Sequence, residues 1–365
     1  MTPATTRGAA ISVAASLVLL MTITGFLTRA YYTTRSSRAE ALYQEGMRLA
    51  GAGHSAQAAD RFRAALVYEH NSEKYRLALA RSLMDLGRWD EAETHLSELS
   101  EDDPTNGPIN LMLARIAGQA HRDSDAVLYY QRAIYGYWPE HPIENRTSAR
   151  FELIGIFKRD GQPRQVLAEL LDLAAEVPED DAATRRRIAT LLLTNGSPDH
   201  AAEIYRAVLA NDRSDGAAEK GLGDALFDES DFVGARNAYR AASRDGLEDP
   251  TIEDRLKECN TVLQLDPTLV RLSANERFDR ARQLLDLTSA AARQCTALPA
   301  DTDAAAQKLM QEKPSRRRDG DTVEMITLAQ QVWKLRHDAC AQPAAPDEAL
   351  TAVMAKIQKQ MAATQ

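Results

Sequence analysis

The sequence predicts an all-α solenoid of helix–turn–helix units, with an N-terminal transmembrane helix and a C-terminal helical cap. Three observations predict this fold class. Small residues recur with a period of about 34 residues, glycines fall at one place in most periods, and residues 8–28 carry no charge. A fixed period of this length is typical of stacked supersecondary units.

The repeat is clearest at residues 73–106, where apolar residues have the spacing of a two-helix hairpin. Each period has a mostly small residue early in its second helix and a large apolar residue four positions later, on the same helix face. A further residue, also mostly small, lies twelve positions before the small residue of the second helix. It belongs to the first helix of the period and leaves room for the paired helix. The first set is Ala58, Ala92, Ala126, Val166, Ala201 and Ala235, and the large residues are Phe62, Leu96, Tyr130, Leu170, Tyr205 and Tyr239.

Glycine stands at the predicted turn between the two helices of four periods, where a left-handed conformation is needed: Gly53, Gly87, Gly161 and Gly196. These breaks exclude a continuous coiled coil. The pattern resembles the tetratricopeptide repeat (TPR) family across residues 39–249. The resemblance implies six units, at 39–72, 73–106, 107–140 with an insertion to 146, 147–181, 182–215 and 216–249.

Composition excludes several classes of function. The net charge of −9 argues against a general nucleic-acid binder, which needs a basic surface. Three cysteines without a CxxC pair are too few for a structural zinc site. The motifs of zinc proteases, P-loop nucleotide binding and serine hydrolases are absent. We therefore expect no enzyme activity, cofactor, metal or small-molecule substrate.

Residues 8–28 predict a transmembrane helix that follows a short tail at 1–7 and precedes a polar spacer at 29–38. These 21 uncharged residues span about 30 Å as a helix, the thickness of a bilayer core. A cleaved signal peptide is the alternative. The candidate cleavage site contains Arg29, which disfavours cleavage. We expect an uncleaved single-pass anchor.

The orientation of the anchor follows from conflicting signals. Arg29, Arg35 and Arg38 outnumber Arg7, which favours a cytoplasmic body by the positive-inside rule. A very short N-terminal tail is instead typical of a signal anchor, and long domains translocate largely regardless of charge. Together with the cysteines, this second argument predicts a bacterial inner-membrane protein whose body lies outside the cytoplasm.

An aromatic insertion at residues 133–145 separates the third unit from the fourth. It contains Tyr135, Tyr137 and Trp138, and Pro139 and Pro142 are expected to keep it out of a helix. One interpretation is an aromatic lip that contacts a partner. The other is that Trp138 and its neighbours fill the junction between two units.

The C-terminal region predicts capping helices at 250–342, then a linker and an amphipathic helix within 343–365. The last helix either packs on the cap, serves as a detachable recognition helix, or pairs between copies of the chain. Cys295 and Cys340 both stand near the ends of predicted helices, so a disulfide that clamps the cap is expected. Cys259 is expected to be a buried free thiol.

The family resemblance implies that the first helix of each unit lines a groove for a protein or peptide partner. Tyr43 and Met47 stand where a carboxylate clamp for chaperone C-termini has Lys and Asn, which disfavours that role. The apolar and basic character of the predicted groove suits a segment with acidic and apolar side chains. The predicted groove residues are Tyr43, Met47, Leu77, Arg81, Met84, Leu111, Arg115, Phe151, Lys158, Arg186, Lys220 and Phe227.

The function that follows is a membrane-anchored scaffold that binds a protein segment in envelope assembly, secretion or maturation. The alternatives are a self-assembling structural membrane protein, or a subunit with an unrecognised activity in residues 270–365. The sequence leaves the partner and the oligomeric state open.

Overall fold

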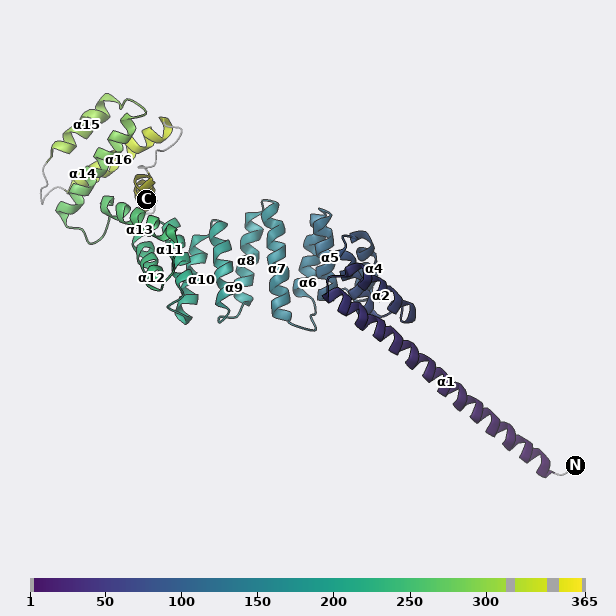
Figure 1. Cartoon of the computed structure of the whole chain (residues 1–365). Coiled ribbons are helices and arrows are strands. Elements are labelled where there is room, and N and C mark those ends of the chain that lie inside the picture. Colours follow the sequence, from purple (N-terminus) through teal and green to yellow (C-terminus); the bar gives the residue numbers. More distant parts are fainter. Residues whose placement is uncertain (1–2, 313–318, 340–347, 363–365) are drawn as a thin grey trace. The chain divides into compact units, whose positions relative to one another are not determined.

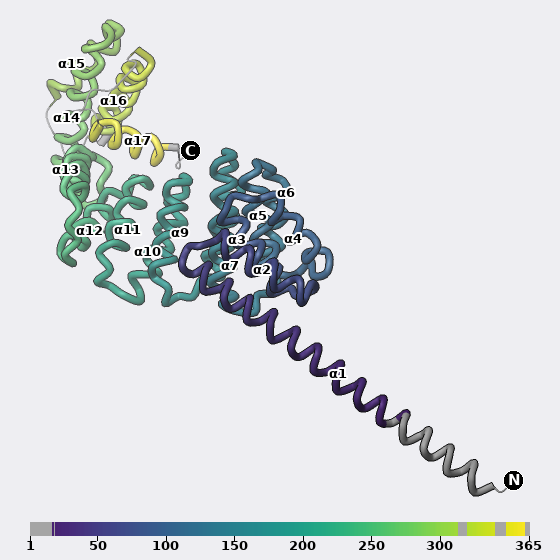
Figure 2. The backbone as a smooth tube through the Cα atoms, turned by 45° about the vertical axis from the view of Figure 1, so that its right-hand side comes forward, coloured from purple at the N-terminus to yellow at the C-terminus, as the bar shows by residue number. Residues whose placement is uncertain are grey.

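The computed structural model describes residues 3–312, 319–339 and 348–362, with only the backbone described at 3–16, 18, 319 and 362. These ranges contain 17 α-helices joined by turns and one isolated backbone bridge. The chain forms two compact units, residues 1–166 and 167–365. Within each unit, successive helices lie side by side as antiparallel pairs (Figures 1 and 2). The predicted all-α solenoid of paired helices is confirmed.

The first unit is built from helical pairs. Helix α1 packs on α2, α3 on α4 and α5 on α6, and the second helix of each pair packs on the helix that follows. The division between the two units falls within α8. The helices are α1 (Pro3–Gly51), α2 (Ser55–Tyr68), α3 (Glu73–Asp85), α4 (Trp89–Asp102), α5 (Gly107–Gln119), α6 (Asp123–Tyr135), α7 (Pro142–Arg159) and α8 (Pro163–Glu176).

Small residues are needed where the helices of a pair meet. A Cβ atom built on Gly46 would lie 2.5 Å from the Phe62 ring, and one on Gly223 would lie 2.7 Å from the Tyr239 ring. Real Cβ atoms do not approach other atoms so closely, so the glycines make room for the rings. The recurring small and large residues of the sequence pattern are all buried. The predicted spacing is therefore a packing requirement.

The turns within the pairs use the left-handed backbone conformation. Glycine supplies it in four pairs, with φ between +65° and +78°, at the positions the sequence predicted: Gly53, Gly87, Gly161 and Gly196. His121 and Ser230 adopt the same region in two further pairs, with φ of +55° and +68°. Non-glycine residues tolerate this region at some cost in free energy, so the turn does not require glycine.

Helix α1 is longer than the sequence predicted. It runs unbroken for 49 residues, so the polar spacer predicted at residues 29–38 is part of this helix. No glycine or proline lies between Gly25 and Gly46 to interrupt it. Within the part of α1 whose side chains are described, and in the other described helices, no stretch is long and apolar enough to cross a bilayer. The transmembrane helix expected at residues 8–28 is therefore not shown, and it stays a prediction.

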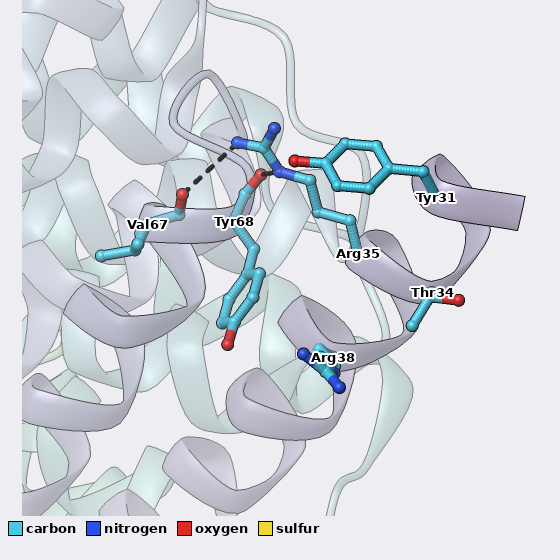
Figure 3. A pocket seen from close by; sticks show the side chains of 6 residues that line it. All are labelled: Tyr31, Thr34, Arg35, Arg38, Val67 and Tyr68. Carbon is cyan, nitrogen blue, oxygen red and sulfur yellow. Dashed lines mark hydrogen bonds between the residues drawn. The ribbon is translucent and has the colours of Figure 1, made fainter. Parts of the chain in front are cut away.

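Helix α1 is joined to α2 by an arginine. The Arg35 Nε atom donates a hydrogen bond of 2.5 Å to the Tyr68 carbonyl, and Nη2 donates one of 3.4 Å to the Val67 carbonyl (Figure 3). These carbonyls belong to the last turn of α2, where helices leave carbonyl groups without internal partners. A cation there also offsets the partial negative charge of the helix end. Arg35 thus ties the extension of α1 to the first pair.

The second unit continues with two helical pairs and five further helices. Helix α9 packs on α10 and α11 on α12, and α12 packs on α13. The helices are α9 (Ala182–Thr194), α10 (Pro198–Asn211), α11 (Gly216–Asp228), α12 (Phe232–Arg244), α13 (Pro250–Leu265), α14 (Ala274–Arg293), α15 (Ala300–Gln311), α16 (Asp319–Ala339) and α17 (Glu348–Ala362).

The terminal helix α17 belongs to the core of the second unit. Its apolar residues are buried together with residues of α11 to α16: Leu350, Val353, Met354 and Ile357. Lys356 forms an ion pair of 2.5 Å with Asp266 at the end of α13, and Lys359 donates a hydrogen bond to the Glu229 carbonyl. Packing on the cap is therefore the interpretation that the structure favours. The surface expected to pair between copies is covered within the chain.

The three cysteines have different environments. Cys259 is a free thiol, fully buried in the core of the second unit. Burial raises its pKa to about 11, because the thiolate is poorly solvated there. Cys295 is disulfide-bonded. Cys340, its predicted partner, lies outside the described residues, so the pairing stays a prediction.

Candidate partner-binding face of the helical repeats

The first helices of successive pairs adjoin one another in both units. Helix α3 contacts both α1 and α5 in the first unit, and α9 contacts α11 in the second. We call the surface formed by these first helices, with α7, the inner face. It carries the predicted groove residues, and each unit has its own part of it.

An aromatic cluster lies at the start of the inner face. The Tyr43 ring packs between the rings of Phe62 and Tyr75, with centroids 5.7 and 5.2 Å away. The Lys74 ammonium stands 4.1 Å from the centre of the Tyr43 ring, where a cation is attracted to the ring. Tyr43 is therefore half-buried and partly covered by its neighbours.

A carboxylate, Glu40, joins this cluster. It accepts hydrogen bonds from the Lys74 ammonium at 3.0 Å and from the Tyr75 hydroxyl at 3.1 Å. Hydrogen bonds from Gln44 and Lys74 lower the pKa of Glu40. Burial and the bond to Glu40 raise the pKa of Tyr75 to about 12. The Lys74 charge is therefore directed at a neighbouring helix of the same chain.

Arg115 is also satisfied within the chain. It forms a two-pronged ion pair with Glu152 of α7, with distances of 2.9 Å from Nε and 2.7 Å from Nη2. The Tyr130 hydroxyl donates a third hydrogen bond to Glu152, at 3.0 Å. Hydrogen bonding to Glu152 raises the pKa of Arg115, and burial together with Glu152 raises that of Tyr130. This geometry is the strong, planar form of carboxylate recognition.

Two predicted basic residues of the first unit stay open to solvent. Arg81 on α3 and Lys158 on α7 are exposed, and neither has an ion-pair partner among the described residues. Met47 on α1 is 42% exposed, which is unusual for a large apolar side chain. Leu111 is buried and therefore does not contribute to an open surface, contrary to the prediction. The remaining predicted residues of this unit are half-buried: Leu77, Met84 and Phe151.

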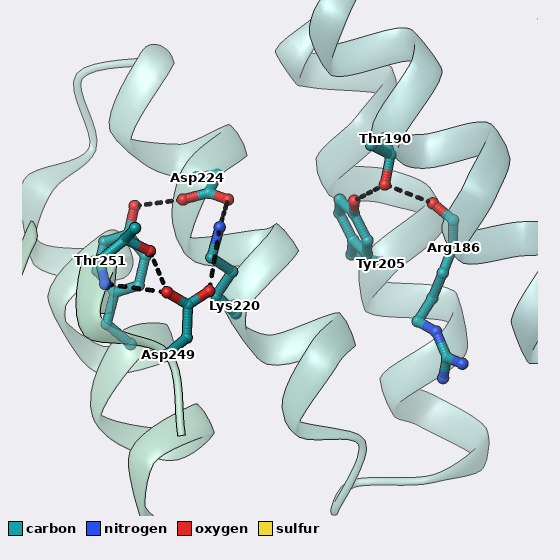
Figure 4. Close-up of polar contacts among 8 residues, drawn as sticks. Arg186, Thr190, Tyr205, Lys220, Asp224, Asp249 and Thr251 are labelled. Carbon is teal, nitrogen blue, oxygen red and sulfur yellow. Dashed lines mark hydrogen bonds and ion pairs between the residues drawn. The ribbon is translucent and has the colours of Figure 1, made fainter. Parts of the chain in front are cut away.

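The second unit pairs its inner basic residues in the same way. Arg186 forms an ion pair with Asp215. Lys220 lies between Asp224 and Asp249, at 2.8 and 3.9 Å (Figure 4). The Tyr239 hydroxyl donates to Asp224 at 2.9 Å. Here too the predicted cations contact carboxylates of the same unit rather than standing free.

Phe227 lies at the end of α11 and is covered on two sides. Its ring contacts that of Phe232 edge to face, with centroids 5.1 Å apart. The Arg255 guanidinium stands 4.3 Å from its centre. This arrangement leaves Phe227 half-buried and makes it a packing residue in addition to a surface one.

The aromatic insertion is shorter than predicted and folds back on α5. Pro142 begins α7, contrary to the expectation that it lies outside a helix, because proline fits the first helical position. Trp138 is only 8% exposed and donates from Nε1 to the Ala133 carbonyl at 2.8 Å. A Cβ atom built on Gly107 would lie 2.5 Å from the indole. Trp138 therefore fills a space at the start of α5.

The two tyrosines of the insertion differ from the tryptophan. Tyr135 is 72% exposed and Tyr137 is 67% exposed. The Tyr137 backbone is nevertheless fixed, since its N–H donates to the Thr105 carbonyl at 2.8 Å and its carbonyl accepts from the Gly107 N–H at 2.9 Å. The structure thus buries one of the three predicted aromatic residues and leaves two at the surface.

The carboxylates that pair with the inner cations were not identified from the sequence. A signal was available for one of them, because Glu40 and Lys74 lie 34 residues apart, one repeat period, and occupy the same position in successive units. The separation of Arg115 from Glu152 is 37 residues and that of Arg186 from Asp215 is 29. No single offset finds all these pairs.

Two family models described as tetratricopeptide repeat match residues 49–116 and 186–247. The first range runs from the end of α1 into α5, and the second from α9 to just beyond α12. No curated protein matches the sequence of the chain.

Several solved structures are similar to the chain at low sequence identity. YrrB, a TPR protein with an unusual peptide-binding site, is 16% identical, with 55% of this chain and 99% of YrrB covered and a TM-score of 0.41. PilW, a type IV pilus biogenesis factor, is 15% identical over 60% of this chain and 98% of PilW, with a TM-score of 0.40. A TPR protein from Parabacteroides merdae is 15% identical over 80% of this chain and 99% of that protein, with a TM-score of 0.39.

The family matches fall on helical pairs with the small-residue contacts and left-handed turns described above. Residues 49–116 lie in the first compact unit and residues 186–247 in the second. The described part of the chain is all-α, and one segment in each compact unit matches tetratricopeptide repeat models.

Proposed function

We propose that the protein is a membrane-anchored scaffold that holds an extended protein segment on its inner face, in the assembly, secretion or maturation of an envelope complex. The observation that carries the proposal is the open part of the inner face in the first unit. There Met47, Arg81 and Lys158 are exposed, while the neighbouring cations are engaged by carboxylates of the chain. An apolar surface with unpaired positive charges suits a segment with apolar and acidic side chains.

The apolar segment of α1 supports the anchor. Seven large apolar side chains between residues 17 and 27 are at least half exposed, on all sides of the helix: Leu17, Leu19, Leu20, Met21, Ile23, Phe26 and Leu27. A helix that is apolar all round is stable only inside a protein or a membrane. A contiguous exposed apolar surface of this kind marks a contact with lipid or with another protein. Together with the uncharged residues 8–16, it supports a single membrane span.

Charge reversal at the two open cations tests the inner face. We expect the Arg81→Glu, Lys158→Glu double variant to bind a fluorescent peptide of alternating leucine and glutamate at least about tenfold more weakly, about 1.4 kcal/mol. The dependence of affinity on salt should fall as well, because two attractive charges become repulsive. Fluorescence anisotropy with the full chain in detergent micelles measures both.

A matched control uses exposed arginines of the second helices. Arg132 on α6 and Arg164 on α8 are exposed and lie off the inner face. The Arg132→Glu, Arg164→Glu double variant changes the net charge equally, so it should reproduce any general electrostatic effect. Equal affinities and equal salt dependence in the two double variants would contradict a binding site on the inner face.

We further propose that the repeats lie outside the cytoplasm of a bacterial host. A fusion of alkaline phosphatase to the C-terminus should then be active in intact cells, because this enzyme needs disulfides that form in oxidising compartments. A fusion that is well expressed and inactive would place the repeats in the cytoplasm and leave the anchor itself unaffected.

A further inference from the structure

A pocket lies where α1 passes the C-terminal end of α2. Its volume is about 310 Å³, at the lower end of the range of small-ligand sites. Figure 3 shows the Tyr31 ring extending toward the Arg35 guanidinium at this place. The residues that line the pocket come from one face of α1 and from the last turn of α2: Tyr31, Thr34, Arg35, Arg38, Val67 and Tyr68.

The pocket has the chemistry of an anion site. Two of its six lining residues are arginines and none is acidic. Arg35 uses two of its five N–H donors on the carbonyls of α2, which leaves three. Arg38 is exposed and has no ion-pair partner among the described residues. Guanidinium groups match the geometry of phosphate oxygens, and tyrosine hydroxyls add donors.

The position of the pocket along α1 relates it to the proposed anchor. Tyr31, Arg35 and Arg38 follow the last residue of the uncharged segment, Thr28, by about 5, 10 and 15 Å along the helix axis. The headgroup layer of a bilayer begins at the end of the hydrocarbon core and is about 5–8 Å thick. Side chains on a helix tilt toward its N-terminus, here toward the anchor, and long arginine stems extend that reach. The Arg35 guanidinium thus reaches headgroup level, and the Arg38 guanidinium reaches the outer edge of the headgroup layer when its stem is extended toward the anchor.

We propose that the cleft formed by Tyr31, Arg35, Arg38 and Tyr68 binds the phosphate of an anionic phospholipid headgroup. The inference rests on the proposed membrane anchor, which brings the cleft to the bilayer surface. A bound headgroup would connect α1, α2 and the membrane at one point. The first helical pair would then be held against the bilayer by a specific lipid contact as well as by the apolar segment.

The test measures which lipids the full chain retains. The protein is reconstituted into vesicles of equal parts phosphatidylglycerol and phosphatidylcholine, and the lipids that remain bound after detergent extraction are counted by native mass spectrometry. We expect wild-type protein to retain phosphatidylglycerol in preference to phosphatidylcholine. The Arg38→Gln variant should reduce that preference about tenfold, as expected for the loss of one charge-assisted contact.

Two further variants make the result specific. Arg48→Gln changes an exposed arginine of the same helix, about 15 Å beyond Arg38 and outside the pocket, and should retain lipid as wild type does. Arg35→Gln should also lose the preference, but it removes the contact with α2. Arg38→Gln, which breaks no ion pair among the described residues, therefore decides the outcome.

The possible results separate the inference from the proposed function. Protein that resists carbonate extraction from the vesicles but shows the same lipid preference in Arg38→Gln and Arg48→Gln would overturn the headgroup site and leave the anchor intact. Protein released by carbonate would overturn the anchor and the headgroup site together. Displacement of the retained lipid by millimolar inorganic phosphate would assign the cleft to free phosphate and overturn its assignment to lipid.

Discussion

Replacing Trp138 with alanine is expected to destabilise the third helical pair by about 3–5 kcal/mol, the usual cost of removing a large buried aromatic side chain. The change opens a cavity over Gly107, where the indole now packs. It also leaves the Ala133 carbonyl without the Nε1 hydrogen bond. Hydrogen exchange measures the effect directly, because the Gly107 and Tyr137 amides are bonded across this junction.

The neighbouring tyrosine provides the control for this prediction. Tyr137 is largely exposed, and its contacts with α5 are made by the backbone. In the Tyr137→Ala variant, the free energy of opening measured by hydrogen exchange at these amides should therefore lie within about 0.5 kcal/mol of the wild-type value. If the Gly107 amide of Trp138→Ala remained as protected as that of Tyr137→Ala, the indole would not be holding the insertion to α5.

Removing the charge of Asp266 is expected to release α17 from the second unit. Asp266 is completely buried, and Lys356 is 14% exposed, so the variant Asp266→Asn leaves a lysine charge poorly solvated. Breaking one side of a buried ion pair costs about 3–5 kcal/mol. Undocking of α17 returns Lys356 to water and avoids this cost. We expect hydrogen exchange in residues 348–362 to accelerate more than a hundredfold.

Two comparisons test the cause of this effect. The Asp279→Asn variant breaks an exposed ion pair with Arg282 and should leave α17 unchanged, because exposed pairs contribute about 0–1 kcal/mol. Adding Lys356→Met to Asp266→Asn removes the uncompensated charge and should restore part of the protection. Protection of α17 that is unchanged in Asp266→Asn would show that its apolar residues alone hold the helix.

The sequence predicted the helical pairs because their packing depends on residue size at fixed spacing. Gly46 with Phe62 and Gly223 with Tyr239 show the reason, since each ring occupies the space that a Cβ atom would need. Turn positions were predicted only where glycine marked them. His121 takes the same left-handed backbone conformation at a cost in free energy that the surrounding packing offsets. No pattern of residue types in the sequence predicts this turn.

The candidate site was less predictable than the fold. Its basic residues were identified from their position within the repeat, but whether they are free depends on carboxylates elsewhere in the chain. Arg115 finds Glu152 on the next first helix, while Arg81, at the equivalent position in its own unit, finds no such partner in the described structure. Which side chains meet depends on helix rotation and side-chain rotamers, which the spacing of residue types does not specify.

The unbroken helix α1 affects how the first helical pair is oriented relative to the N-terminal segment. An α-helix advances about 1.5 Å and turns about 100° with each residue. Helix α1 runs unbroken from Pro3 to Gly51. The rotation of the first helical pair about the α1 axis, relative to the N-terminal segment, therefore depends on the number of residues between them. One residue inserted after Arg29 would barely change the length of α1, yet it would swing the first pair through more than a quarter turn relative to the N-terminal segment. The number of residues in α1, whatever their identity, thus determines the rotation of the first pair relative to the N-terminal segment.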